Sequence, residues 1–420
     1  MLARFSNGRS LFGSLVFVSL AVLAACGGSS EPTKTPPVEA AKTAAPETKP
    51  APPVADKNNG TVDTKADKPA DKPADKPAPK EDKPAPPKER FALPNVDFGS
   101  PDAKKPVKLN GKEIVAQACM FDTSVPDMQA EWFSDALLHM VAAPDGSLYV
   151  TDPEKKVRHY IPEPGETCKL AIDPKFGDNG IMKFPEAPDG LSVLADGTLV
   201  VMGFEKTYKY IGGKVETIDC RIRELFPDGK TAFYRFTDEA SRIDIEGGCK
   251  ATPWKYTGWE LSKEDKAKDS QIWGILKIRP WEKDLLMFMT LRGDHYIGVH
   301  GQDGKLKRKL GKDSKKDKNL KEGESICHAT DMTTCAGGIC LIDSNCKRLS
   351  IWDPQKGKLV DTVQLGDITN IFSPWPVAIA SANGTTYLGV TAKEPRGDKP
   401  RTADSKDISH AVIFRVKGLN

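Results

Sequence analysis

Short apolar runs alternate with turn residues through most of the chain. Each of six runs rich in β-branched and aromatic residues follows a tight turn of Gly, Asn or charged residues. Asp-Gly and Asn-Gly are favoured in such turns because both central residues can need a positive φ. The turns and runs are DGSLYVTD from Asp145, DGTLVVMGF from Asp196, DGKTAFYRF from Asp228, KDLLMFMTL from Lys283, GGICLIDSN from Gly337 and NGTTYLGVT from Asn383. We therefore predict six β-hairpins.

Further strands surround each predicted hairpin. An apolar segment such as GLSVLA or IWGILKIRP precedes each turn, and runs such as RLSIWDPQKG and KLVDTVQL follow. The turns recur about every 48 residues, a spacing typical of propeller blades. Four-stranded antiparallel units repeated radially form a β-propeller. We therefore predict an all-β, six-bladed β-propeller of four-stranded antiparallel blades over residues 91–420. Because Asp196 and Asp228 lie close together, the frame of the third blade is open, and an open β-sandwich is the alternative.

The first 25 residues have the pattern of an export signal. Arg4 and Arg9 precede an apolar stretch, residues 11–25, that is too short to span a bilayer comfortably. The end of this stretch, LAAC, resembles the bacterial lipobox, which implies cleavage before Cys26 and lipidation of its thiol. Gly27 in place of Asp favours the outer membrane, again by resemblance. The alternative is an ordinary signal peptide followed by a chance cysteine.

Residues 26–90 are predicted to be the lipidated cysteine and a disordered linker. The segment ADKPADKPADKPAPK repeats Asp, Lys, Pro and Ala and contains almost no apolar side chains. Proline disfavours both helix and sheet, and a chain this polar cannot offset the entropy lost on ordering. The linker is therefore interpreted as a solvated tether, with contact to the cell wall as the alternative.

The charge balance gives no indication of nucleic-acid binding. The net charge is only +3 over 420 residues. A basic cluster at residues 304–324 lacks interleaved aromatic residues and is interpreted as a solvated loop. Contact of this loop with anionic lipid or polysaccharide is the alternative.

Eight cysteines follow Cys26, an even number that indicates four disulfides in an exported chain. If AGG is a hairpin loop, Cys335 and Cys340 face each other across it. Cys346 lies in the next turn, at the blade end where the strand near Cys327 starts, so these two cysteines are predicted to pair. Sequence proximity suggests the pairs Cys119–Cys168 and Cys220–Cys249. A metal site is the alternative, but the Cys-x2-Cys spacing typical of structural zinc is missing. The alternative ligands are Cys327, His328, Cys335, Cys340 and Cys346.

The segments APDGSLYVTDPEKKVRHY and GGICLIDSNCKRLSIWDPQKGKLV resemble NHL-type blades and blades of the gluconolactonase and senescence-marker-protein group. The shared pattern is a turn glycine, an apolar strand, Asp, a polar turn, a basic residue and another strand. NHL-type blades mostly bind partners, whereas the gluconolactonase group carries a hydrolytic calcium site. Asp343-Ser344 matches one motif of that group. The Glu-Gly-Pro stretch that supplies a metal ligand there is missing here.

Propeller ligands generally meet the loops at one end of the blades, so polar and aromatic residues predicted in those loops are binding candidates. These candidates are Asp135, His139, Asp152, Glu205, Arg292, Asp294, His295, His328, Asp343 and Trp375. A structural interpretation also exists, because an Asp after a strand commonly accepts backbone hydrogen bonds in the next turn.

Taken together, these patterns favour a membrane-anchored envelope lipoprotein whose propeller binds a ligand or protein. The expected partners are the membrane, through Cys26, and an envelope protein or glycan. No catalytic residue and no cofactor is assigned. The alternative is a calcium-dependent lactonase or esterase-like hydrolase, for which several converging oxygen ligands would be needed.

Overall fold

The computed structural model places residues 88–420 in one unit and residues 1–87 in another. It describes residues 89–99, 106–131, 137–152, 154, 156–236, 239–257, 274–290, 297–312, 324–335, 337–371, 374–395, 397 and 407–419. Cys26 and the predicted signal and linker lie outside the described residues. The division of the chain into signal, linker and propeller therefore stays a prediction.

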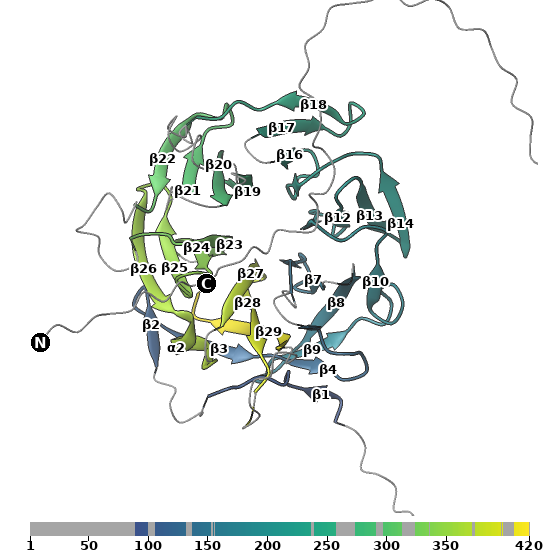
Figure 1. Cartoon of the computed structure of the whole chain (residues 1–420), viewed down its shortest axis with the longest axis vertical. Helices are drawn as coiled ribbons and strands as arrows, with labels where there is room; N and C mark the ends of the chain where they lie inside the picture. Colours follow the sequence, from purple (N-terminus) through teal and green to yellow (C-terminus); the bar gives the residue numbers. More distant parts are fainter. Residues whose placement is uncertain are drawn as a thin grey trace, which may run out of the picture. The chain divides into compact units, whose positions relative to one another are not determined.

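The described strands form six hydrogen-bonded sheets around a common centre (Figure 1). Four of these sheets have four antiparallel strands each, in chain order from the centre outward. The first contains β11 (Gly190–Val193), β12 (Leu199–Met202), β13 (Thr207–Ile211) and β14 (Lys214–Ile218), and the second contains β15 (Glu224–Leu225), β16 (Ala232–Phe236), β17 (Glu239–Asp244) and β18 (Lys250–Pro253). The third contains β19 (Gly274–Trp281), β20 (Asp284–Thr290), β21 (Ile297–His300) and β22 (Leu306–Leu310). The fourth contains β23 (Ala329–Cys335), β24 (Gly338–Asp343), β25 (Arg348–Asp353) and β26 (Lys358–Gln364). The prediction of a β-propeller of four-stranded antiparallel blades is confirmed.

The other two sheets are larger because the N-terminal segment adds strands to them. One contains β6 (Met140–Ala142), β7 (Leu148–Thr151), β8 (Lys156–Glu163), β9 (Lys169–Ile172), β4 (Met120–Asp122), β1 (Phe91–Ala92) and β10 (Ile181–Lys183). The other contains β27 (Trp375–Ala382), β28 (Thr385–Lys393), β29 (Ile408–Lys417), β3 (Lys112–Ala118), β2 (Val107–Leu109) and β5 (Gln129–Glu131). The predicted count of six four-stranded blades is therefore wrong, because only four of the six described sheets have that form.

Pairing between the two ends of the propeller closes the ring. The C-terminal strand β29 pairs antiparallel with β3, with Phe414 opposite Ala118 and Lys417 opposite Val115. Strands far apart in sequence thus share one sheet, and their backbone groups are paired rather than left at an open edge. The short helix α2 (Leu365–Thr369) follows β26. Among the described residues, no helix has the length and apolar character needed to span a membrane.

All six predicted hairpin turns join paired antiparallel strands. Three of them are held by an Asp side chain that accepts a backbone N–H two residues later: Asp145 from Ser147, Asp196 from Thr198 and Asp228 from Lys230. The following glycines have positive φ, which a residue without Cβ adopts at little steric cost. The Asp228 turn joins β15 to β16, so the frame predicted for that unit is confirmed.

Apolar side chains fill the spaces between neighbouring sheets. Val157 of β8 packs with Leu199 and Val201 of β12, and Leu349 of β25 packs with Val412 of β29. Strands β7, β11 and β12 are buried on both faces, because each sheet is covered by a neighbour on either side. Stacking of sheets, rather than a one-sided core, supplies most of the buried apolar surface.

The structure contains the four predicted disulfides: Cys119–Cys168, Cys220–Cys249, Cys327–Cys346 and Cys335–Cys340. The reason given for the last pair is wrong, because Cys335 lies opposite Gly338 and Cys340 lies opposite Thr333. The two cysteines are diagonal neighbours across the hairpin, with Cα atoms 5.7 Å apart. That separation suits a disulfide.

Candidate functional site

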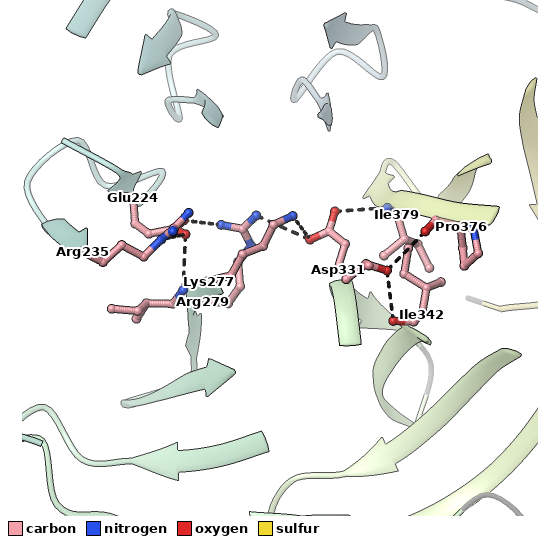
Figure 2. Close-up of polar contacts among 10 residues, drawn as sticks. Glu224, Arg235, Lys277, Arg279, Asp331, Ile342, Pro376 and Ile379 are labelled. Atoms are coloured by element: carbon pink, nitrogen blue, oxygen red, sulfur yellow. Dashed lines mark hydrogen bonds and ion pairs between the residues drawn. The ribbon is translucent and has the colours of Figure 1, made fainter. Parts of the chain in front are cut away.

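The innermost strands of the sheets meet around the centre of the propeller, and several of them place charged side chains there (Figure 2). We call the five charged residues the central charge cluster. They are Glu224 of β15, Arg235 of β16, Lys277 and Arg279 of β19, and Asp331 of β23. Three neighbouring sheets therefore contribute to one group of charges.

Glu224 connects two of these sheets. Its Oε1 accepts a hydrogen bond from Arg235 Nε at 3.0 Å, and its Oε2 accepts one from Arg279 Nη1 at 2.6 Å. The backbone N–H of Ile278 lies 3.4 Å from Oε1. The Glu224 side chain is 5% exposed. A carboxylate this buried needs such partners to offset the loss of its hydration.

Asp331 extends the cluster to a third sheet. Lys277 Nζ lies 2.8 Å from Asp331 Oδ1, and Arg279 Nη2 lies 3.5 Å from the same oxygen. The backbone N–H of Ile379, in β27, donates to Oδ2 at 3.2 Å. Arg279 thus bridges the two carboxylates, as Figure 2 shows.

The pKa values in the cluster reflect burial and mutual attraction. Burial alone would raise the pKa of Asp331, but the cations of Lys277 and Arg279 outweigh it and lower that pKa. Burial lowers the pKa of Lys277, and the carboxylate of Asp331 opposes this shift. For Arg279, the carboxylates of Glu224 and Asp331 outweigh burial and raise the pKa. The lowered pKa of Asp331 and the raised pKa of Arg279 both favour the charged forms of these two groups.

His139, one of the predicted binding residues, belongs electrostatically to this centre. Burial and the nearby cations of Lys277, Arg235 and Arg279 lower its pKa to about 3. Its backbone N–H donates to Thr151 Oγ1 at 2.9 Å, which ties the segment before β6 to the end of β7. His139 is therefore neutral at pH 7 and faces a positive environment.

Sequence reasoning missed the five residues of the central charge cluster, although a signal was present. The segment IWGILKIRP is predicted as a strand before its turn because it is apolar, and that prediction does not single out the two cations within it. Lys277 and Arg279 are two residues apart in β19, so they share one face of that strand. Charged residues on one face of an otherwise apolar inner strand are the pattern that would have predicted the cluster.

Two other predicted binding residues are buried at the ends of strands: Asp152 directly follows β7, and Asp343 is the last residue of β24. Asp152 Oδ1 accepts the backbone N–H of Glu154 at 2.9 Å, and Asp152 pairs with Arg158 at 3.3 Å. Asp343 pairs with Arg348 at 3.5 Å. We call Asp152–Arg158 and Asp343–Arg348 the turn pairs. Both fit the structural interpretation, in which the carboxylate organises its own turn.

Asp343 has further backbone partners. Its Oδ2 accepts the N–H of Cys327 at 2.7 Å, and its Oδ1 accepts the N–H groups of His328 at 3.0 Å and Cys346 at 3.1 Å. The sulfurs of Cys327 and Cys346 lie close to this carboxylate, a grouping that could hold a metal if the thiols were free. Here the two sulfurs are bonded to each other, and both carboxylate oxygens already accept hydrogen bonds.

The remaining candidates are spread over the propeller. Glu205 is exposed in the turn between β12 and β13, and its backbone N–H donates to Glu186. Trp375 begins β27 and is 36% exposed. Asp135, Arg292, Asp294 and His295 lie outside the described residues. Whether these residues share a binding face stays a prediction.

A Ser–His–Asp hydrogen-bond chain crosses the first sheet. His159 Nε2 lies 2.8 Å from Ser147 Oγ, and His159 Nδ1 lies 2.9 Å from Asp173 Oδ2. Serine hydrolases use such a chain, but their serine must be accessible and must pass its proton to His. Ser147 is 4% exposed, and its hydroxyl donates to Asp145 at 2.6 Å. His159 is also stacked on Tyr149. This geometry suits a structural link better than a nucleophile.

Comparison with solved structures shows similarity at low sequence identity. The β-propeller domain of Doa1, titled a WD40 propeller, has 11% identity and a TM-score of 0.40, over 76% of this chain and 94% of that chain. The nidogen/laminin complex has 13% identity and a TM-score of 0.38, over 58% and 84%. The Kuenenia stuttgartiensis hydrazine synthase has 14% identity and a TM-score of 0.36, over 61% and 76%. No protein family and no curated protein matches the chain.

Proposed function

We propose that this protein is an envelope lipoprotein whose propeller binds a ligand or partner protein. The observation that carries the proposal is the convergence of charged side chains from three sheets on the centre of a closed ring. The β3–β29 pairing closes the ring around that centre, and four disulfides cross-link the chain of the propeller. Rigid elements of this kind position binding groups with little loss of entropy on binding.

The membrane anchor in this proposal rests on the LAAC motif at residues 23–26 and on the polar linker that follows it. Mass spectrometry of the mature N-terminus tests it. We expect an N-terminal peptide that begins at Cys26 and carries acyl chains. An unmodified Cys26, or cleavage at another position, would remove the anchor from the proposal.

The binding role can be tested by site-specific photo-cross-linking with the full chain in its native envelope. A cross-linker at Trp375, on an innermost strand, is expected to capture a partner. The matched control is Val360 of the outer strand β26, which is 41% exposed against 36% for Trp375. Equal capture from both positions, or none from either, would contradict a specific binding surface near Trp375.

The alternative of a calcium-dependent hydrolase has less support. Calcium needs several converging oxygen ligands that are free to bind it. Both oxygens of Asp343, the residue that matches the gluconolactonase motif, already accept backbone N–H groups, and Arg348 pairs with the same carboxylate. A reproducible lactone or ester turnover that is lost on changing Asp343, in a protein that stays folded, would restore this alternative.

A further inference from the structure

An exposed aromatic ring lies in the turn between β12 and β13. Phe204, in this turn, is 40% exposed. The turn is fixed by Glu186, whose carboxylate accepts the backbone N–H groups of Glu205 at 2.6 Å and Lys206 at 3.1 Å. The hydroxyl of Tyr208 donates to the same carboxylate at 2.8 Å. A well-anchored turn therefore presents an apolar ring to solvent, where the ring gains nothing from the hydrophobic effect.

The guanidinium of Arg221 lies against this ring. Its Cζ is 4.8 Å from the ring centre of Phe204 and 4.8 Å from that of Tyr234, in β16. Its Nε donates to the backbone oxygen of Phe204 at 3.2 Å. We call Phe204, Arg221 and Tyr234 the stacked arginine site. Two neighbouring sheets build this site, and the contacts with the rings orient the guanidinium plane before any ligand binds.

The backbone beside Arg221 is also held in place. Arg221 lies in the connection from β14 to β15, directly after Cys220, which is bonded to Cys249. The hydroxyl of Thr207, in β13, donates to the backbone oxygen of Cys220 at 2.8 Å. A side chain that is oriented in advance loses less entropy when it binds a partner.

Arg221 differs from Arg223, whose guanidinium also lies over the Phe204 ring. Arg223 is buried and pairs with the carboxylate of Asp189. Arg221 is half-buried, and no described residue accepts a hydrogen bond from its Nη atoms. A guanidinium has five N–H donors, of which only the Nε donor of Arg221 is used within the described part of the chain. Its Nη donors are therefore open to an acceptor from outside.

We propose that the stacked arginine site binds an acidic side chain of a partner protein, while an apolar residue beside that acid packs on Phe204. This inference deepens the proposed binding function and rests on it. The two oxygens of a carboxylate match the guanidinium fork, and arginine and aromatic residues are enriched at protein interfaces. Two exposed carboxylates near the site, Glu205 and Asp219, would repel an extended polyanion such as an anionic membrane surface. A protein segment with a single acid avoids that repulsion.

An NMR titration of the full chain tests the proposal, because the Nε–H signal of Arg221 reports binding at that side chain. The probe is the capped peptide Gly-Glu-Phe-Gly, and the reference is the capped peptide Gly-Gln-Phe-Gly, which lacks only the negative charge. The glutamate peptide should shift the Arg221 signal saturably in the millimolar range. It should bind about tenfold more tightly than the glutamine peptide, because only the carboxylate forms charge-assisted hydrogen bonds with the guanidinium.

Variants locate the binding, followed through the backbone N–H signals of the β12–β13 turn. Arg221→Gln should weaken binding of the glutamate peptide by about tenfold or more. The matched control is Arg242→Gln, because Arg242 also lies over an aromatic ring, that of Phe233, but donates to Gln302. This control should leave the affinity unchanged. Phe204→Ala should weaken binding of both peptides, because it removes the surface that their shared phenylalanine contacts. Thermal unfolding confirms that each variant is folded.

Four results would overturn the proposal. They are equal affinities for the two peptides, absence of saturable binding in the millimolar range, equal losses in Arg221→Gln and Arg242→Gln, and unchanged binding in a folded Phe204→Ala protein. A membrane role would appear as a preference for phosphatidylglycerol over phosphatidylcholine vesicles that disappears in Arg221→Gln. Such a preference, without peptide binding, would overturn the choice of a protein partner.

Cross-linking at Trp375 separates this inference from the proposed function. Capture of a partner that weakens when Arg221→Gln is introduced would support the stacked arginine site as part of the partner's contact. Capture that is equally strong with and without Arg221→Gln would overturn this inference and leave the proposed function standing.

Discussion

Buried charges occur in two contrasting arrangements in this propeller. In the turn pairs, one Asp meets one Arg, and the charges balance. In the central charge cluster, three cations share two carboxylates. Each turn pair lies within one sheet and a few residues of sequence, whereas the cluster joins three sheets.

The two arrangements use buried charge for different structural purposes. The carboxylates of the turn pairs also accept backbone N–H groups, so their charge is used to shape a turn. The central cluster organises no turn, and Arg279, which contacts both of its carboxylates, is its most exposed member. The turn pairs therefore shape single turns, whereas the cluster links neighbouring sheets at the centre of the propeller.

The largest expected effect comes from removing a carboxylate from a turn pair. Asp343→Ala leaves Arg348 buried without its partner and leaves backbone N–H groups unsatisfied. We expect the free energy of unfolding to fall by about 3–5 kcal/mol, measured by denaturant titration without reductant. The control is Glu216→Ala, an exposed position on β14, which should change stability little. A loss as small as that of the control would remove the structural role assigned to Asp343.

A second prediction concerns the disulfide beside the same turn. Cys327–Cys346 joins residues 19 positions apart. Replacing both cysteines with serine should lower the free energy of unfolding by about 3 kcal/mol, because the unfolded chain gains conformational freedom. The Asp152 turn has no cysteine within it, so the comparison of the two turns shows how far the disulfide supports Asp343. An unchanged unfolding free energy would show that the disulfide does not stabilise this turn.

The central region should show its own dependence on pH. The pKa of His139 is lowered to about 3 in the folded protein, against 6.5 without burial. Below pH 6.5 the unfolded chain binds a proton that the folded protein does not, so stability falls as the pH falls from 6.5 toward 3. The His139 side chain is only partly buried, so we expect the free energy of unfolding to fall by about 1–2 kcal/mol at pH 5. This fall should be absent in His139→Gln.

His410 is the matched control for this pH experiment. Burial would lower its pKa, but Asp127 and Glu394 outweigh burial and raise it. The stabilisation that His410 gives the folded protein is therefore fully present below pH 6.5 and is lost as the pH rises through the raised pKa. His410→Gln should therefore lower stability by a constant amount below pH 6.5 and remove the decline that His410 causes as the pH rises above 6.5. If both substitutions changed the stability profile over the same pH range, His139 and His410 would not have separate electrostatic environments.

The smallest expected effect comes from replacing Arg279 of the central charge cluster. Arg279→Met leaves Glu224 with Arg235 and leaves Asp331 with Lys277. We expect the free energy of unfolding to fall by only about 1 kcal/mol, because each carboxylate keeps a cation. Arg158→Met, measured by the same denaturant titration, should be clearly more destabilising since Asp152 loses its paired Arg. Equal losses would show that Arg279 is as structural as Arg158.

Local sequence patterns accounted for the hairpins, the four cysteine pairs and the turn role of Asp152 and Asp343. Such features depend on residues close together in the chain, where turn chemistry and alternation act directly. The count of six four-stranded blades failed for a nonlocal reason. Strands β1 and β4 add to the sheet of β6 to β9, whereas β2, β3 and β5 join the sheet of the C-terminal strands β27 to β29.

By itself, the sequence determined where the chain turns, which segments are strands and that the cysteines pair. The tertiary structure alone decided which strands face the centre and which charges meet there. Glu224, Arg279 and Asp331 are separated by about 50 residues or more in sequence, and only the packing of three successive sheets brings them within hydrogen-bond distance. The physical reason is that alternation assigns a side chain to a face of a strand, whereas the neighbours of that face depend on how whole sheets pack.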